Sequence, residues 1–150
     1  MFLLLFGAYA AQCPSGTWSI DGTDDSGACT ACVAGSSTGG VTEGATSCTQ
    51  CLAGSYTSST TGTVNCVACL AGNFAAITGS QACTACPNGK YQNENSATSC
   101  KDTTSGYCSS LSGTCTGSGV TGATTEIKCA IGKYSNSISS FSCTDVLAGS

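Results

Sequence analysis

Hydrophobic and polar positions follow a short phrase that recurs along the chain. Each phrase opens with a cysteine, has a glycine three residues later and usually an aromatic side chain two residues after that, and then runs through a polar stretch to the next cysteine. C-x-x-C pairs join successive phrases, and those that begin at Cys29, Cys48, Cys66 and Cys83 are 19, 18 and 17 residues apart. Self-similarity at such a short period predicts a repeat array rather than one globular core.

The pattern within one phrase predicts a small β-hairpin. The glycine after the opening cysteine suits a turn, and a second glycine four residues before the closing cysteine, as at Gly44, Gly62 and Gly79, marks the turn back. The aromatic residue falls on a short strand, where we expect its ring to cover a neighbouring disulfide. The fold class expected is small disulfide-rich β, an elongated tandem array of short stapled hairpins with almost no helix. The aromatic positions are Trp18, Tyr56, Phe74, Tyr91 and Tyr134, with Ser37 as the departure.

All fourteen cysteines are used when each one that opens a phrase is joined to the next cysteine in the chain. Thr103 and Glu126 stand where two further cysteines are expected, and this scheme makes those two positions each other's partners. Spacing alone does not fix connectivity, but a crossed scheme would leave unpaired thiols there, so local pairing is favoured. The pairs expected are Cys13–Cys29, Cys32–Cys48, Cys51–Cys66, Cys69–Cys83, Cys86–Cys100, Cys108–Cys115 and Cys129–Cys143.

The competing interpretation of the cysteines is structural zinc. Two C-x-x-C pairs separated by about 15 to 20 residues also have the spacing of a four-cysteine site. This interpretation leaves six cysteines unused, and C-x-x-C pairs in secreted proteins are usually disulfides. We therefore expect bridges and no bound metal or cofactor. The sets that would fit zinc are Cys29, Cys32, Cys48 and Cys51, and Cys66, Cys69, Cys83 and Cys86.

Small polar residues dominate the composition and limit the core. Ser, Thr and Gly number 23, 22 and 20 of the 150 residues, so no large aliphatic core can form. Each repeat has about one aromatic and a few aliphatic side chains, too few to order it unaided. Closing a loop of about 15 residues with a disulfide contributes roughly 3 kcal/mol. The bridges are therefore expected to stabilise each repeat.

Charge and residue types exclude several functions. The chain has no His, no Arg and four Lys, with a formal net charge of -4. Nucleic-acid binding is not expected without clustered basic residues, and an enzyme is not expected when His is absent and every Cys is committed to a bridge. The lysines Lys90, Lys101, Lys128 and Lys133 read as solvated side chains. The acidic segment 21–25 resembles a short calcium-binding loop in composition, but we interpret it as a turn.

The N-terminus indicates export. Residues 1–10 are an apolar, signal-peptide-like leader that ends in a small-x-small pattern, which predicts a mature start near Ala11. The leader is too short for a membrane-spanning helix. The organisation expected is a leader at 1–10, five cysteine-rich repeats at 11–102, a divergent insert repeat at 103–128, and a final repeat with the start of a decayed or truncated one at 129–150. Serine- and threonine-rich runs at 57–61 and 135–142 leave room for O-linked glycans.

The recurring phrase carries a family resemblance. CLAGSYTSSTTGTVNCVAC from Cys51 and CPNGKYQNENSATSC from Cys86 resemble ephrin-receptor-like cysteine-rich repeats, and the Ser/Thr/Ala-rich filling resembles ciliate surface proteins of the immobilisation-antigen type. The likeness covers 13–101 and 129–143, and residues 103–128 depart from it. It implies an extracellular cysteine-rich module located at the cell surface.

We expect a non-catalytic extracellular structural protein of the surface-coat kind. The first alternative is a subunit of an extracellular filament or appendage, with copies of itself as partner through end-to-end or lateral contacts. The second alternative is a receptor or adhesin ectodomain spacer, because a rod of repeats can present a binding face that no motif reveals.

Overall fold

Seven short antiparallel hairpins follow one another in the computed structural model, which describes residues 10–24, 27–115 and 120–147. In each hairpin, a strand that follows the opening turn pairs with the residues just before the next opening position. The fold class predicted from the sequence is confirmed, and the described residues contain no helix. The strands are β1 Thr17–Trp18, β2 Thr30–Ala31, β3 Ser36–Ser37, β4 Thr49–Gln50, β5 Ser55–Tyr56, β6 Val67–Ala68, β7 Asn73–Phe74, β8 Thr84–Ala85, β9 Lys90–Tyr91, β10 Lys101–Asp102, β11 Tyr107–Ser110, β12 Thr125–Lys128, β13 Lys133–Tyr134 and β14 Thr144–Asp145.

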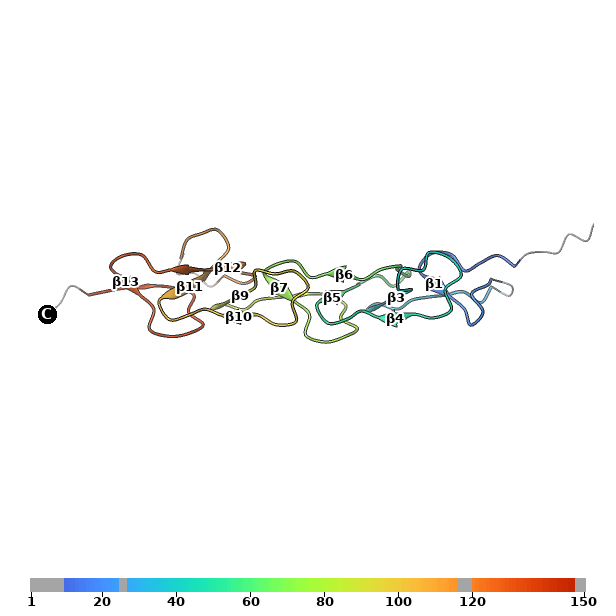
Figure 1. Ribbon diagram of the computed structural model, residues 1–150, viewed down its shortest axis with the longest axis horizontal. Helices are drawn as coiled ribbons and strands as arrows, with labels where there is room; N and C mark the ends of the chain where they lie inside the picture. Colours follow the sequence, from blue (N-terminus) through green and yellow to red (C-terminus); the bar gives the residue numbers. More distant parts are fainter. Residues whose placement is uncertain (1–9, 25–26, 116–119, 148–150) are drawn as a thin grey trace, which may run out of the picture.

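The hairpins stack end to end into a rod whose described chain runs from one tip to the other (Figure 1). We number the repeats 1 to 7. Of the leader predicted at 1–10, only Ala10 belongs to the described residues. No helix in the described part of the chain is long and apolar enough to cross a membrane. The repeats open at Cys13, Cys32, Cys51, Cys69, Cys86, Thr103 and Cys129.

Two turns in each of repeats 2 to 7 rely on left-handed backbone. The opening turn has a glycine three residues after the opening position, such as Gly54 with a φ of 87°. The return turn, four residues before the closing position, has the same handedness. Gly79 (φ 71°) occupies it in repeat 4, whereas Ser96 (φ 57°) and Ser139 (φ 58°) occupy it in repeats 5 and 7. A residue with a Cβ costs about 1–2 kcal/mol there, so the surrounding contacts must hold these serines in place.

Backbone hydrogen bonds join each repeat to the next. Between repeats 3 and 4, the Gly54 N–H donates to the Ala75 carbonyl (2.8 Å), and the Thr57 N–H donates to the Ser80 carbonyl (3.3 Å). In return, the Gly79 N–H donates to the Cys51 carbonyl (2.8 Å). Equivalent bonds recur along the rod. The short strands alone are too small to be stable, so the hairpins depend on these bonds to their neighbours.

Contacts also reach from each repeat to the second repeat along the chain. A Cβ added to the opening-turn glycine of repeats 1 to 5 would come closer than 3.0 Å to the backbone of a return turn two repeats on. Only glycine permits this approach. The array is therefore held by second neighbours as well as nearest neighbours, which the repeat pattern did not predict. The pairs are Gly16 with Gly62, Gly35 with Gly79, Gly54 with Ser96, Gly72 with Gly122, and Gly89 with Ser139.

The centre of the rod is built from sulfur and small polar groups. The opening cysteines of repeats 1 to 5 are at most 1 % exposed, and so is Thr103. Aliphatic side chains lie mainly outside, with Leu52, Leu70 and Ile77 each about 70 % exposed. A second buried column consists of the residues six positions after each opening residue, which we call the axis residues: Ser19, Thr38, Thr57, Ala75, Gln92, Ser109 and Ser135.

Candidate functional site

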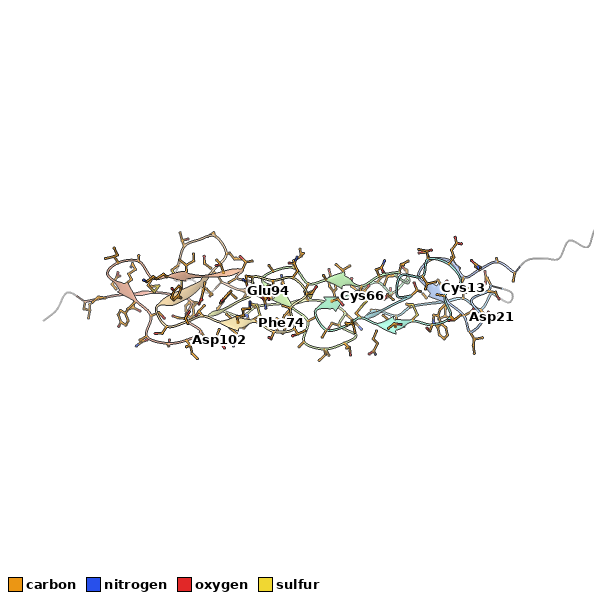
Figure 2. All side chains as sticks on the ribbon, in the orientation of Figure 1. Cys13, Asp21, Cys66, Phe74, Glu94 and Asp102 are labelled. Carbon is orange, nitrogen blue, oxygen red and sulfur yellow. A yellow bond between two sulfur atoms is a disulfide. The ribbon has the colours of Figure 1, made fainter. Side chains whose placement is uncertain are left out.

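Seven disulfides form a ladder along the rod, and all fourteen cysteines belong to it. The bridges are local and are the pairs of the sequential scheme; Cys66, labelled in Figure 2, belongs to the third. Six of them close loops with sequence separations of 14 to 16, and the bridge within repeat 6 closes a separation of 7. They are Cys13–Cys29, Cys32–Cys48, Cys51–Cys66, Cys69–Cys83, Cys86–Cys100, Cys108–Cys115 and Cys129–Cys143.

The zinc interpretation does not fit this arrangement. A four-cysteine site needs four thiolates that converge on one point. In the structure, Cys29 is bonded to Cys13 and Cys32 is bonded to Cys48, so the two sulfurs of one C-x-x-C pair belong to different bridges. The same holds for the other C-x-x-C pairs. Because a disulfide sulfur is no thiolate, neither predicted set has the ligands that zinc requires.

Repeat 6 replaces the missing bridge with hydrogen bonds. The Glu126 carboxylate accepts hydrogen bonds from the Thr104 N–H and the Thr104 hydroxyl, both at 2.8 Å. Thr103, in the place of the opening cysteine, donates its hydroxyl to the Ser140 carbonyl (3.1 Å) and accepts from the Ser140 N–H (2.9 Å). Glu126 is thus tied to the residue after Thr103, and Thr103 itself is tied to the next repeat. Sequence analysis paired the positions but did not find these contacts, because nothing in the spacing indicates a carboxylate that caps the neighbouring residue.

The position five residues after the opening residue lies beside the closing cysteine of the following repeat. Ser37 has its Oγ 3.4 Å from the Sγ of Cys66, and Tyr56 shares the lining of a surface hollow of about 410 Å³ with Cys83. Tyr56 and Cys83 thus border one hollow, and the predicted cover of a disulfide by a ring stays a prediction.

In repeat 6 that position is taken by Cys108, and two disulfides meet there. The Cys115 and Cys143 sulfurs, which belong to different bridges, are 3.5 Å apart. The sulfurs of Cys108, Cys115 and Cys143 all lie within 4.8 Å of one another. At this position one bridge therefore lies against another, where most other repeats have an aromatic residue.

The acidic segment 21–25 forms a turn that uses its own carboxylate. Asp21 accepts hydrogen bonds from the Thr23 N–H (3.0 Å) and the Ser19 hydroxyl (2.9 Å). These bonds, that of the Thr23 backbone first, hold the pKa of the Asp21 carboxyl below its ordinary value. Asp25 lies outside the described residues. The geometry is that of an Asx turn, as the turn interpretation expects.

Three of the four lysines form ion pairs rather than standing alone in solvent. Lys90 contacts Asp102 at 2.5 Å, and Lys133 contacts Asp145 at 2.6 Å. In both cases the partners face each other across a hairpin. Because they are far apart in the sequence, the sequence did not reveal the pairing. Lys101 contacts Glu94 at 3.3 Å. Only Lys128 has no ion pair among the described residues, and the other three keep side-chain exposures of 37 to 43 % within surface ion pairs.

Comparisons with known proteins identify no relative. The sequence matches no model of a known protein family and no curated protein. The assignment therefore comes from the geometry alone, which is that of a small disulfide-rich β protein made of tandem stapled hairpins.

Proposed function

We propose that this chain is a non-catalytic extracellular structural protein that contributes to a cell-surface coat. The observation that carries the proposal is the core, which consists of seven disulfides and small polar side chains instead of packed aliphatic groups. Such a core persists only where thiols stay oxidised, which is the condition outside the cell. Many bridges in a chain of low apolar content are typical of secreted modules.

The shape and surface support a structural role. A rod of stacked hairpins holds its two tips apart (Figure 1) and presents a surface rich in Ser and Thr, between which aliphatic side chains such as Leu52 and Leu70 are exposed. Thr60 and Thr61 are exposed in the run at 57–61 and would accept O-linked glycans, whereas Thr57 is an axis residue and is buried. The resemblance to ephrin-receptor-like repeats and to surface antigens of the immobilisation type points in the same direction.

The available chemistry also supports a non-catalytic protein. The chain has no histidine, and the described cysteines are all in bridges, so neither a Ser-His nor a Cys-His pair can be assembled. The carboxylates of Asp21, Asp102 and Glu126 are each engaged in hydrogen bonds that fix a turn or a hairpin. Their role is therefore structural.

Location and redox state test the proposal together. Intact cells of the native source are treated with a membrane-impermeant amine label, and permeabilised cells serve as the control for total protein. The protein is then alkylated before and after reduction, and its N-terminus is sequenced. We expect labelling on intact cells, no alkylation before reduction, and a start near Ala11. Labelling only after permeabilisation, or free thiols with stoichiometric zinc, would overturn the proposal.

A further inference from the structure

Two disulfides touch each other in repeats 6 and 7. The Sγ atoms of Cys115 and Cys143, which belong to different bridges, are 3.5 Å apart. The Sγ of Cys108 lies within 4.8 Å of both. Elsewhere among the described residues, no bridge has a further cysteine sulfur within 4.8 Å of both its own sulfurs. A thiol released from one of these two bridges therefore finds a second bridge within reach.

An open hollow of about 290 Å³ gives access to two of the four sulfurs. Cys115 and Cys143 line this hollow, one from each bridge. Their partners, Cys108 and Cys129, do not line it, and Cys108 is fully buried. A dissolved thiol that enters the hollow can therefore attack one sulfur of each bridge and release the other.

The lining of the hollow favours an anionic thiol. Lys128 and Lys133 belong to the lining, and none of its described residues carries a carboxylate. Lys133 is paired with Asp145 at 2.6 Å, whereas Lys128 has no ion pair among the described residues. The ligand that suits this hollow is therefore a small thiol that carries carboxylate groups.

Exchange begins when such a thiolate attacks the Cys115 sulfur. A bond forms between the two, the Cys108–Cys115 bond breaks, and its electron pair leaves on the Cys108 sulfur. The Cys108 thiolate then attacks the Cys143 sulfur and displaces the Cys129 thiolate. Finally, Cys129 attacks Cys115 and expels the small thiol unchanged. Two disulfides are present before and after, so no oxidant or reductant is consumed.

Attack on the other sulfur of the hollow leads to the same product. When the thiolate bonds Cys143 first, Cys129 is released and attacks Cys115. This displaces Cys108, which then attacks Cys143 and expels the small thiol. Entry through the hollow thus selects one new pairing from the three that four cysteines allow.

We propose that this hollow is a thiol–disulfide exchange site, at which a small anionic thiol converts the bridges Cys108–Cys115 and Cys129–Cys143 into Cys108–Cys143 and Cys115–Cys129. The original bridges each lie within one repeat, whereas the new ones join repeat 6 to repeat 7. The exchange therefore adds a covalent clamp between two repeats that backbone hydrogen bonds and the chain itself otherwise connect. This activity goes beyond the proposed structural role and does not depend on where the protein is located.

Tryptic mapping distinguishes the two pairings, because Lys128 and Lys133 separate the cysteines. The oxidised full chain is incubated with reduced glutathione without oxygen, alkylated, and digested without reduction. In the original pairing, peptide 102–128 contains its own bridge, and peptides 129–133 and 134–150 are joined to each other. In the exchanged pairing all three are joined, and fragmentation spectra identify the linked cysteines. The Cys86–Cys100 bridge, which joins peptide 91–101 to the peptide that ends at Lys90, is the internal control.

A variant with a free thiol removes the need for an added one. Cys115→Ser leaves Cys108 as a thiol within reach of Cys143, so the free thiol should move to Cys129. Cys100→Ser is the matched control, because it frees the opening cysteine of repeat 5, which belongs to no such sulfur cluster among the described residues. Alkylation and mapping locate the free thiol in each variant, and circular dichroism checks that each is folded.

We expect glutathione to produce the three joined peptides, while the Cys86–Cys100 control stays intact. Cysteamine, a cationic thiol, should act about fivefold more slowly at low salt, once each rate is divided by that thiol's rate with a simple disulfide, and added salt should remove the difference. The free thiol should move to Cys129 in Cys115→Ser, at a rate independent of protein concentration, and stay at Cys86 in Cys100→Ser.

Unchanged peptides in glutathione would overturn the inference, as would equal exchange at the control bridge or joining through Cys108–Cys129. Equal normalised rates for the two thiols would refute the choice of an anionic ligand. All of these results would leave the surface location, tested separately on intact cells, untouched.

Discussion

Gly54→Ala tests whether contacts between second neighbours stabilise the rod. Gly54 has a φ of 87°, and a Cβ there would overlap the carbonyl of Ser96 two repeats on. Gly106 has nearly the same φ but open space around it among the described residues, so Gly106→Ala is a matched control. Both substitutions place a Cβ in left-handed backbone, at a cost of about 1–2 kcal/mol. Only Gly54→Ala must also displace the backbone of repeat 5, which adds about 1–3 kcal/mol.

The comparison uses guanidinium unfolding of the oxidised proteins at a concentration too low for self-association. Gly54→Ala should lower the free energy of unfolding by about 1–3 kcal/mol more than Gly106→Ala does. Amide exchange supplies a local readout, because the Ser96 N–H donates to the Cys69 carbonyl at 2.7 Å and should exchange faster in Gly54→Ala alone. Equal destabilisation by the two substitutions, with unchanged exchange at Ser96, would refute the reasoning.

Four further outcomes are expected. Replacing both Cys51 and Cys66 by Ser removes a loop closure that contributes about 3 kcal/mol. Limited proteolysis should then cleave repeats 1 to 5 before repeats 6 and 7, and uniform cleavage of all repeats would contradict this. Glu126→Gln should reduce stability in denaturant by about 1–2 kcal/mol relative to Glu43→Gln, because it weakens two charge-assisted bonds. Hydrogen bonds from Lys90 and then Ser139 lower the pKa of Asp102. The stability that the ionised Asp102 contributes is therefore present above the ordinary carboxyl pKa and is lost as the pH falls through the lowered value. Asp102→Asn should diminish the acid-induced loss of folded structure seen by circular dichroism. Full reduction should unfold the whole chain, and a native spectrum that survives reductant would reveal an apolar core not accounted for here.

The sequence predicted what depends on local spacing. The hairpins and opening turns follow from a glycine and an aromatic at fixed distances from a cysteine. The contact of Gly54 with Ser96 could not be predicted, because no pattern within one repeat says which distant backbone approaches a glycine. The axis residues did leave a signal, since a small or polar side chain recurs six positions after each opening residue, as at Thr38 and Ser109. Its meaning depends on the stacking, which places that position on the centre line.

Less of the candidate site than of the fold could be predicted from the sequence. Among the described residues, Gly106 and Gly132 have open space around them although each stands three residues after an opening position, as the covered glycines do, so only three-dimensional packing distinguishes them. The ion pair of Lys90 with Asp102 depends on hairpin register, which the sequence left open. Glu126 stands in the place of a closing cysteine. Its carboxylate bonds Thr104 rather than Thr103, which stands in the place of the partner cysteine.

The ladder of bridges has a mechanical consequence. From Cys13 to Cys100, successive bridges are separated by only two residues within each C-x-x-C, so tension passes through sulfur–sulfur bonds and bypasses the 13 to 15 residues that each bridge encloses. A loop of about 15 residues would otherwise lengthen by roughly 50 Å when pulled straight. While oxidised, this part of the rod is almost inextensible, whereas repeat 6 has no bridge between positions 103 and 126 and can lengthen. A reductant would convert the rod, bridge by bridge, into a tether several times longer.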